Sequence, residues 1–179
     1  MNTRKGIYAG SFDLATEGHR WVISEGARLF DHLTVAIGEN PGKKYLFTIK
    51  ERLEMLREIT SEWSNVSVDY FSQRYLIEYA SESEATHILR GIRGADDFRM
   101  EKTIRYINDD IAHTGDDESR NITTVYVIPP RHLVEVSSSA VKGLVGGDPN
   151  WREVVRKYVP ASVLDKLEKK LALEKNGPT

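Results

Sequence analysis

GIYAGSFDLATEGH, residues 6–19, indicates a strand, a loop and a helix near the start of this chain. The apolar run Gly6–Ala9 predicts a buried strand, and the small polar residues after it predict a tight loop. Thr16 is a good N-cap, and apolar residues recur at helical spacing from Trp21 onward, so the loop leads into a helix. A helix N-terminus behind such a loop offers backbone N–H groups and the positive end of a dipole to an anion. His19 is expected in the first helical turn, beside that anion.

Strand and helix patterns alternate along the next hundred residues. The strand candidates are short, apolar and rich in β-branched or aromatic residues: Ile7–Ala9, Leu33–Ile37, Val66–Phe71, His87–Leu89 and Thr123–Ile128. The helix candidates begin after Thr16 and at Thr48 and continue at Tyr75–Glu82, Asp97–Ala112, Ser138–Val145, Asn150–Tyr158 and Ser162–Leu173. This order predicts an α/β fold, a Rossmann-like doubly wound parallel five-stranded sheet with helices on both faces and a helical C-terminal region. The length favours one domain over residues 1–179.

Three helices carry finer signals. Thr48 followed by Glu51 is a capping box, and Ser162 followed by Asp165 matches the same motif. The helix expected at residues 97–112 places Met100, Ile104, Ile107 and Ile111 on one face, which we expect to be buried.

Composition narrows the class of protein. The 179 residues are 40% hydrophobic and 29% charged, which is typical of soluble globular proteins. A net charge of −2 gives no case for a nucleic-acid or membrane-surface partner. The absence of cysteine excludes disulfides and thiolate metal sites, and the sequence has no run of 18 apolar residues. We therefore expect a cytoplasmic protein with no membrane partner.

Three further segments follow predicted strands, where a doubly wound sheet would bring them beside the first loop. They are Asn40–Lys44, Arg90–Arg93 and Val136–Ser139, which offer cations, hydroxyl groups and a helix start. Each alone has an ordinary explanation: a solvated lysine pair, a sheet-edge arginine, a serine cap. The first loop alone matches neither a Walker A sequence nor a dinucleotide fingerprint. Together the segments predict a polyphosphate cradle.

These segments resemble the nucleotidylyltransferase superfamily and, within it, the bacterial phosphopantetheine adenylyltransferases. The resemblance extends from about Lys5 to Leu171. Its specific residues are Gly10–Asp13, Thr16 in place of the first histidine of the signature, Gly18-His19, Lys43-Lys44 before Phe47-Thr48, Arg90–Arg93, Asp97-Phe98, Glu101, Asn108 and Val136–Ser139.

The resemblance implies transfer of an adenylyl group from ATP to 4′-phosphopantetheine, giving dephospho-coenzyme A and pyrophosphate. It implies catalytic roles for His19, Lys43 and Arg90. It implies ATP contacts from Ser11, Phe12, His19, Gly91, Ile92, Arg93, Glu101, Val136, Ser137, Ser138 and Ser139. It implies acceptor contacts from Ser11, Lys43, Leu76 and Arg90. Mg²⁺ is expected with ATP, carried by phosphate oxygens and water rather than by protein ligands. The family is usually a homohexamer.

Two other functions stay open at this point. One is another small nucleotidylyltransferase, for cytidylyl or nicotinamide-mononucleotide adenylyl transfer, and the other is a non-catalytic nucleotide- or coenzyme A-binding module. The chain also departs from the family. Leu14 stands where proline is usual, so the turn lacks the fixed φ of proline and is expected to be more mobile. The acidic stretch Gly115–Arg120 looks like an insertion, which is explained either as a solvated loop or as a cation site.

Overall fold

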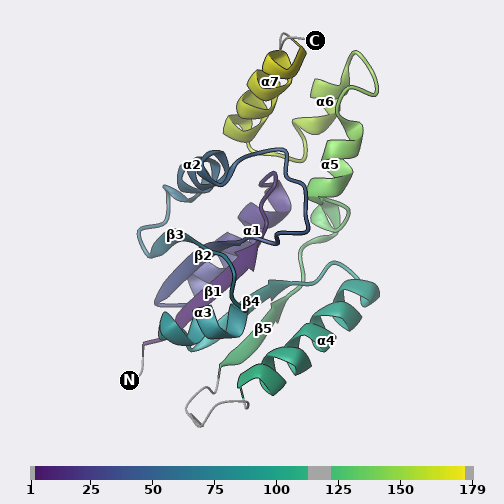
Figure 1. Cartoon of the computed structure of the whole chain (residues 1–179). Helices are drawn as coiled ribbons and strands as arrows, with labels where there is room; N and C mark the ends of the chain where they lie inside the picture. The colour runs from purple at the N-terminus through teal and green to yellow at the C-terminus, as the bar shows by residue number, and fades with distance from the viewer. Residues whose placement is uncertain (1–2, 113–121, 176–179) are drawn as a thin grey trace.

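A five-stranded parallel sheet forms the centre of the protein in the computed structural model, which describes residues 3–112 and 122–175. The strand order is β3-β2-β1-β4-β5, so the first strand lies in the middle and the chain crosses from one half of the sheet to the other after β3 (Figure 1). The elements are β1 (Lys5–Gly10), α1 (Glu17–Leu29), β2 (His32–Gly38), α2 (Ile49–Thr60), β3 (Val66–Phe71), α3 (Leu76–Glu82), β4 (His87–Gly91), α4 (Ala95–Ala112), β5 (Thr123–Val127), the 3₁₀ turn η1 (Arg131–Leu133), α5 (Ser138–Leu144), α6 (Trp151–Val155) and α7 (Ala161–Lys175). The predicted doubly wound α/β fold is confirmed.

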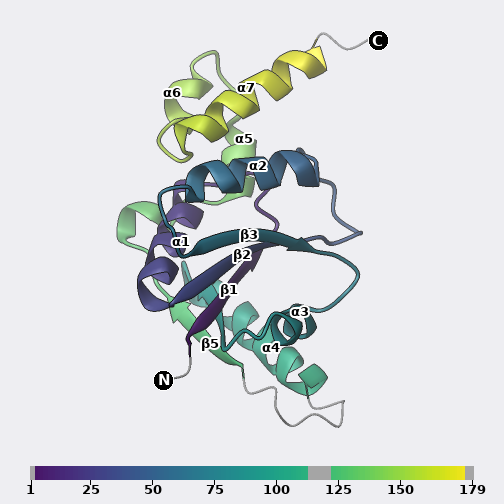
Figure 2. The ribbon, with the colours of Figure 1, turned by 90° about the vertical axis from the view of Figure 1, so that its left-hand side faces the viewer.

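Helices cover both faces of the sheet. Figure 2 shows α2 on one side of the strands and α3 and α4 on the other. Successive side chains of β1 point to opposite faces: Tyr8 joins the core cluster under α1 and α2, whereas Ile7 and Ala9 join the cluster that contains α3. Because both faces are buried, the central strands are apolar at nearly every position rather than alternating.

The C-terminal helices form a further layer outside α2 (Figure 2). Val163 and Leu167 of α7 are fully buried in the same cluster as α1 and α2. Lys166 pairs with Glu58 at 2.8 Å and Lys170 with Glu51 at 3.0 Å, so two ion pairs fix α7 along α2. Just before α7, the Tyr158 carbonyl accepts from the backbone N–H of Glu17 at 2.8 Å, so this part of the chain contacts the end of the first loop.

One of the two predicted capping boxes is confirmed and the other is wrong. Thr48 Oγ1 accepts from the backbone N–H of Glu51, and Glu51 accepts from the backbone N–H of Thr48 at 2.7 Å. Helix α7 begins at Ala161, two residues earlier than it would with Ser162 as its N-cap. The backbone N–H groups of Val163 and Leu164 both donate to the carbonyl oxygen of Pro160, so Ser162 already lies inside the helix.

The buried face of α4 also differs from the prediction. Met100 and Ile107 are 57% and 50% exposed, whereas Glu101 and Asn108 are buried. The reason is an ion pair between Glu101 and Arg90 of β4, which turns a charged residue toward the sheet. Apolar periodicity alone cannot reveal such a partner, because it lies eleven residues away in the sequence.

Two further expectations concern the acidic stretch and membrane-spanning segments. The acidic stretch Gly115–Arg120 lies outside the described residues. Within residues 3–112 and 122–175, no helix has both the length and the apolar character needed to cross a bilayer.

Candidate active site

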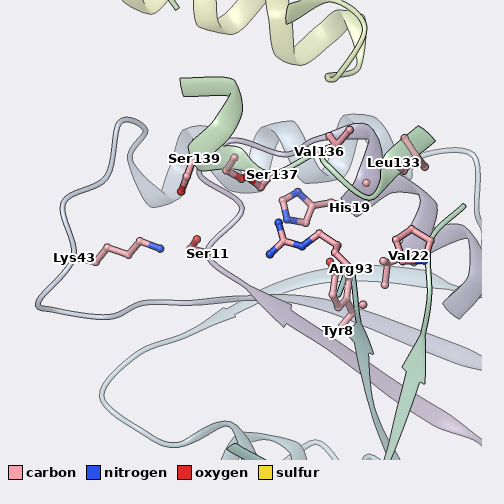
Figure 3. A pocket seen from close by; sticks show the side chains of 14 residues that line it. Tyr8, Ser11, His19, Val22, Lys43, Arg93, Leu133, Val136, Ser137 and Ser139 are labelled. Atoms are coloured by element: carbon pink, nitrogen blue, oxygen red, sulfur yellow. The ribbon is translucent and has the colours of Figure 1, made fainter. Parts of the chain in front are cut away.

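A cavity of about 240 Å³ opens at the carboxyl ends of β1 and β4 (Figure 3). It lies at the position where the strand order of a doubly wound sheet reverses and ligands usually bind. The residues predicted for the site that line it are Ser11, His19, Lys43, Gly91, Arg93, Val136, Ser137, Ser138 and Ser139. The structure thus brings together four segments that are up to 128 residues apart in the sequence.

The loop after β1 is held by burial and by hydrogen bonds. Phe12 is 1% exposed and has a φ of 46°, in the left-handed region that a bulky residue rarely adopts. Asp13 and Leu14 are also fully buried, their shared peptide bond is cis, and the Leu14 carbonyl accepts from Ser138 Oγ at 2.6 Å. Packing and this hydrogen bond therefore hold Leu14 in place, although it stands where the family that the chain resembles usually has proline.

His19 is held in one tautomer by the start of its own helix. The backbone N–H of Thr16 donates to His19 Nδ1 at 3.0 Å, and Thr16 Oγ1 accepts from the backbone N–H of His19 at 3.3 Å. This is a capping box in which histidine replaces the usual glutamate. Since Nδ1 accepts a hydrogen bond, the proton of the neutral ring lies on Nε2.

The environment keeps His19 neutral. Burial and, as the smaller cause, the nearby positive charge of Arg93 together lower the pKa of His19 to about 4. The Phe12 ring packs edge-on against the imidazole with centroids 5.1 Å apart. At neutral pH the ring is therefore neutral and oriented, and its Nε2–H can donate a hydrogen bond to a phosphate oxygen.

The lowered pKa predicts a loss of stability in acid. The unfolded chain takes up a proton on His19 near pH 6.5, whereas the folded protein resists it down to about pH 4. The stabilisation is thus complete above pH 6.5 and is lost as the pH falls through that window. Between pH 7 and pH 5 the free energy of unfolding should fall by at most about 2 kcal/mol from this group. Urea denaturation of the wild type and His19→Gln at both pH values measures it, because glutamine keeps the capping box; equal losses in the two proteins would contradict the assignment.

Two cations point into the cavity from opposite sides. Figure 3 shows Lys43 reaching from its loop toward Ser11, and the Arg93 guanidinium lying beside His19. Arg93 is fixed by Asp97, which accepts from Arg93 Nε at 2.7 Å and from a terminal nitrogen at 3.1 Å. The guanidinium in turn lowers the pKa of the Asp97 carboxyl. The fixed arginine keeps other N–H donors for an anion in the cavity.

The cavity is also lined by residues to which the sequence analysis gave no contact in the site: Tyr8, Gly18, Val22, Pro129 and Leu133. Tyr8 is 7% exposed, and burial raises the pKa of its phenol, so it stays protonated at physiological pH. Its ring packs against Phe12 at 5.4 Å. Its place two residues before Gly10, on the same face of β1, is the signal that could have identified it.

Arg90, Glu101 and Leu76 lie together in a second, smaller hollow beneath α4. Arg90 Nε donates to Glu101 Oε2 at 2.7 Å, a terminal nitrogen also contacts Glu101 Oε1, and the other donates to the Ala9 carbonyl at 2.9 Å. The pair is bidentate and largely buried. Glu101 was expected among the ATP contacts, but the structure groups it with Arg90 and Leu76, which were expected to contact the acceptor.

Two residues expected to contact ATP lie behind the cavity wall. Phe12 packs beneath the His19 ring. Ile92 is 6% exposed, its backbone N–H donates to the Val127 carbonyl at 2.8 Å, and its side chain faces a separate hollow beside Phe98. Neither is among the residues that line the cavity of His19.

The chain is similar to proteins of known families over most of its length. The cytidylyltransferase-like family model matches residues 7–144. A phosphopantetheine adenylyltransferase of Neisseria meningitidis serogroup C is 46% identical over 164 residues, which are 92% of this chain and 92% of that protein. The Chromobacterium violaceum protein of the same name is 45% identical, over 92% of this chain and 95% of that one.

A solved structure supports the fold. The nicotinic acid mononucleotide adenylyltransferase of Plasmodium falciparum, in complex with NaAD, superposes with a TM-score of 0.64 over 94% of this chain and 96% of that one. At 18% identity this likeness concerns the fold alone. The sequence identity to the bacterial enzymes carries the assignment: the chain belongs to the phosphopantetheine adenylyltransferase family, within the cytidylyltransferase-like group.

Proposed function

We propose that this enzyme transfers the adenylyl group of ATP to 4′-phosphopantetheine, giving dephospho-coenzyme A and pyrophosphate. The observation that carries the proposal is the convergence of the neutral His19, Lys43 and Arg93 on one cavity, with a second arginine, Arg90, in the neighbouring hollow. Such a set of donors suits a reaction between two phosphorylated substrates.

The reaction needs alignment and charge stabilisation rather than a base. A phosphate monoester has a second pKa near 6, so about nine-tenths of it is already dianionic at neutral pH. One of its oxygens attacks the α-phosphorus of ATP, and the bond from that phosphorus to the bridging oxygen breaks, releasing pyrophosphate. No proton has to be removed from the attacking oxygen. The protein must bring two anions into line and stabilise the charge that develops in the transition state.

The cavity residues divide between these tasks. His19 Nε2–H and the first turn of α1 would stabilise the α-phosphate, and Ser11 would hydrogen-bond the same group or the incoming phosphate. Lys43 would contact both anions. Ser137, Ser138 and Ser139 would hold the β- and γ-phosphates through hydroxyl and backbone N–H groups, with Gly91 and Arg93 along the nucleotide. The exposure of Lys43 on its loop supports a role that begins when substrates arrive.

The acceptor would lie against the second hollow rather than inside it, because the hollow's volume of about 10 Å³ has room for only about one water molecule. Arg90 would bind the phosphate of phosphopantetheine, and Leu76 would contact the pantetheine chain. Glu101 would orient Arg90 through the bidentate ion pair rather than contact the nucleotide. An arginine held in this way presents its remaining donors in a fixed plane, which suits a tetrahedral phosphate.

Magnesium would enter with ATP. Among the described residues that line the cavity are cations and hydroxyl groups but none of the carboxylates that Mg²⁺ prefers. We therefore assign the ion no protein ligands; phosphate oxygens and water would hold it, and it would offset phosphate charge when bound.

We also propose a cytoplasmic homohexamer. Supporting observations are the exposed apolar side chains Phe98, Met100, Tyr106 and Ile107 of α4 and Ile128 beside the edge strand β5, which contacts between copies of the chain could bury. The use of ATP and the absence of cysteine support the cytoplasmic location. Light scattering should give six times the 20.3 kDa chain mass.

The decisive experiment is a coupled assay for pyrophosphate release. With ATP, the purified protein should turn over 4′-phosphopantetheine and leave nicotinamide mononucleotide at background, and CTP should not replace ATP. Preference for nicotinamide mononucleotide or CTP would identify a different nucleotidylyltransferase. Binding of ATP without release of pyrophosphate from any acceptor would identify a binding module instead.

A further inference from the structure

Asp13 is the one buried carboxylate of the first loop, and it joins three separate segments around the cavity. Its side chain is 1% exposed. Oδ1 accepts from the backbone N–H of Phe47 at 2.9 Å, and Oδ2 accepts from the backbone N–H of Leu46 at 3.0 Å and from Lys142 Nζ at 2.8 Å. Burial alone would raise the pKa of this carboxyl, but these donors outweigh it and the pKa is lowered, so Asp13 is ionised in the folded protein.

The segments that Asp13 joins carry the phosphate-binding groups on opposite walls. Leu46 and Phe47 end the loop that presents Lys43. Lys142 lies in α5, whose first turn presents Ser137, Ser138 and Ser139. Asp13 itself follows Ser11 and Phe12. The carboxylate therefore fixes the distance between Lys43 and the serine turn, Ser137–Ser139. Without it, this distance would depend on the exposed loop that carries Lys43 and on α5, a helix of only seven residues.

We propose that Asp13, together with Lys142, is a positioning residue that aligns Lys43 with the serine turn across the reacting phosphates. Neither side chain is required to touch the substrate. The effect would act through geometry, since a displacement of about 1 Å in a charged group can cost about 100-fold in rate. The proposal rests on the proposed function, because Lys43 and the serines matter here through the phosphates that they would bind.

The test compares two variants that disrupt the contacts of Asp13, here called the tie, with one matched control. Asp13→Asn removes the charge and places an amide N–H₂ against backbone donors. Lys142→Met keeps the length of the side chain and removes only the tie to α5, from a residue that is 30% exposed and should tolerate the change. Lys166→Met is the control: Lys166 is similarly exposed, at 25%, and binds a carboxylate on α2 away from the cavity. Each tie variant should lose at least about tenfold in kcat. The control should lose stability with kcat unchanged.

A double-mutant cycle separates positioning from general structural support. If Asp13 acts by placing Lys43, its replacement should change kcat by less than about threefold once Lys43→Met has removed the group being placed. The same cycle with Lys142→Met decides the question should Asp13→Asn fail to fold. Wild-type kcat in a folded Lys142→Met, or losses that multiply in the cycles, would overturn the proposal. A wild type that releases no pyrophosphate in the same assay would overturn the proposed function, and the positioning role with it.

Discussion

His19→Ala should lower kcat by about 100-fold or more, a loss of roughly 3 kcal/mol of transition-state stabilisation. The reason is that the alanine variant lacks the Nε2–H donor of the imidazole. Nδ1 is occupied by the backbone N–H of Thr16, so Nε2–H is the donor that the ring of this cavity-lining residue keeps free, and the lowered pKa keeps the ring neutral throughout the neutral pH range. A donor fixed before the substrate arrives needs no reorganisation as charge develops on the α-phosphate.

The measurement is steady-state pyrophosphate release at saturating ATP and acceptor, with circular dichroism to verify folding. Alanine also removes one of the two hydrogen bonds of the capping box, from the Thr16 N–H to the side chain at position 19, which costs stability by about 1 kcal/mol. His19→Gln is therefore the matched variant, since glutamine at this position can still accept from the N-cap. Both variants should lose kcat, while only alanine should lose this hydrogen bond. Turnover near the wild-type value in a folded His19→Gln would contradict the role of the imidazole.

Arg90→Met should impair both acceptor binding and stability. The guanidinium and Glu101 form a bidentate pair whose side chains are 21% and 9% exposed. Removal of the cation leaves Glu101 buried without its partner, which should lower the free energy of unfolding by about 2 kcal/mol, less than for a fully buried pair. If Arg90 also binds the acceptor phosphate, kcat/KM for phosphopantetheine should fall by about 100-fold.

Glu101→Gln distinguishes the two roles of Arg90. It keeps the arginine and a neutral hydrogen-bonding partner, so the phosphate contact should survive with looser orientation, and kcat/KM should fall by about tenfold only. Urea denaturation and acceptor titrations on both variants give the comparison. An Arg90→Met protein that loses stability but keeps the acceptor KM of the wild type would restrict this residue to a structural role.

The central sheet was predictable because its signals are local. Apolar runs such as Leu33–Ile37 and Val66–Phe71 are short and rich in β-branched or aromatic side chains, and helical patterns separate them. The capping box at Thr48 likewise depends on residues only three apart. The prediction was wrong at α4, where a partner eleven residues away turns Glu101 toward Arg90 and exposes Met100. It was also wrong at α7, where the neighbouring Pro160 carbonyl accepts the first helical hydrogen bonds, so the helix starts before Ser162.

Local patterns in the sequence identify the segments that carry the chemistry: the first loop with His19, the Lys43 loop, the Arg90–Arg93 segment and the serine turn. Their residue types and their places after strands are local properties, and a parallel sheet must gather its strand ends at one edge. How each group is held depends on the folded structure. The tautomer and lowered pKa of His19, the pairing of Arg90 with Glu101, and the contacts of Asp13 depend on burial and on atoms brought close by folding, which no local pattern records.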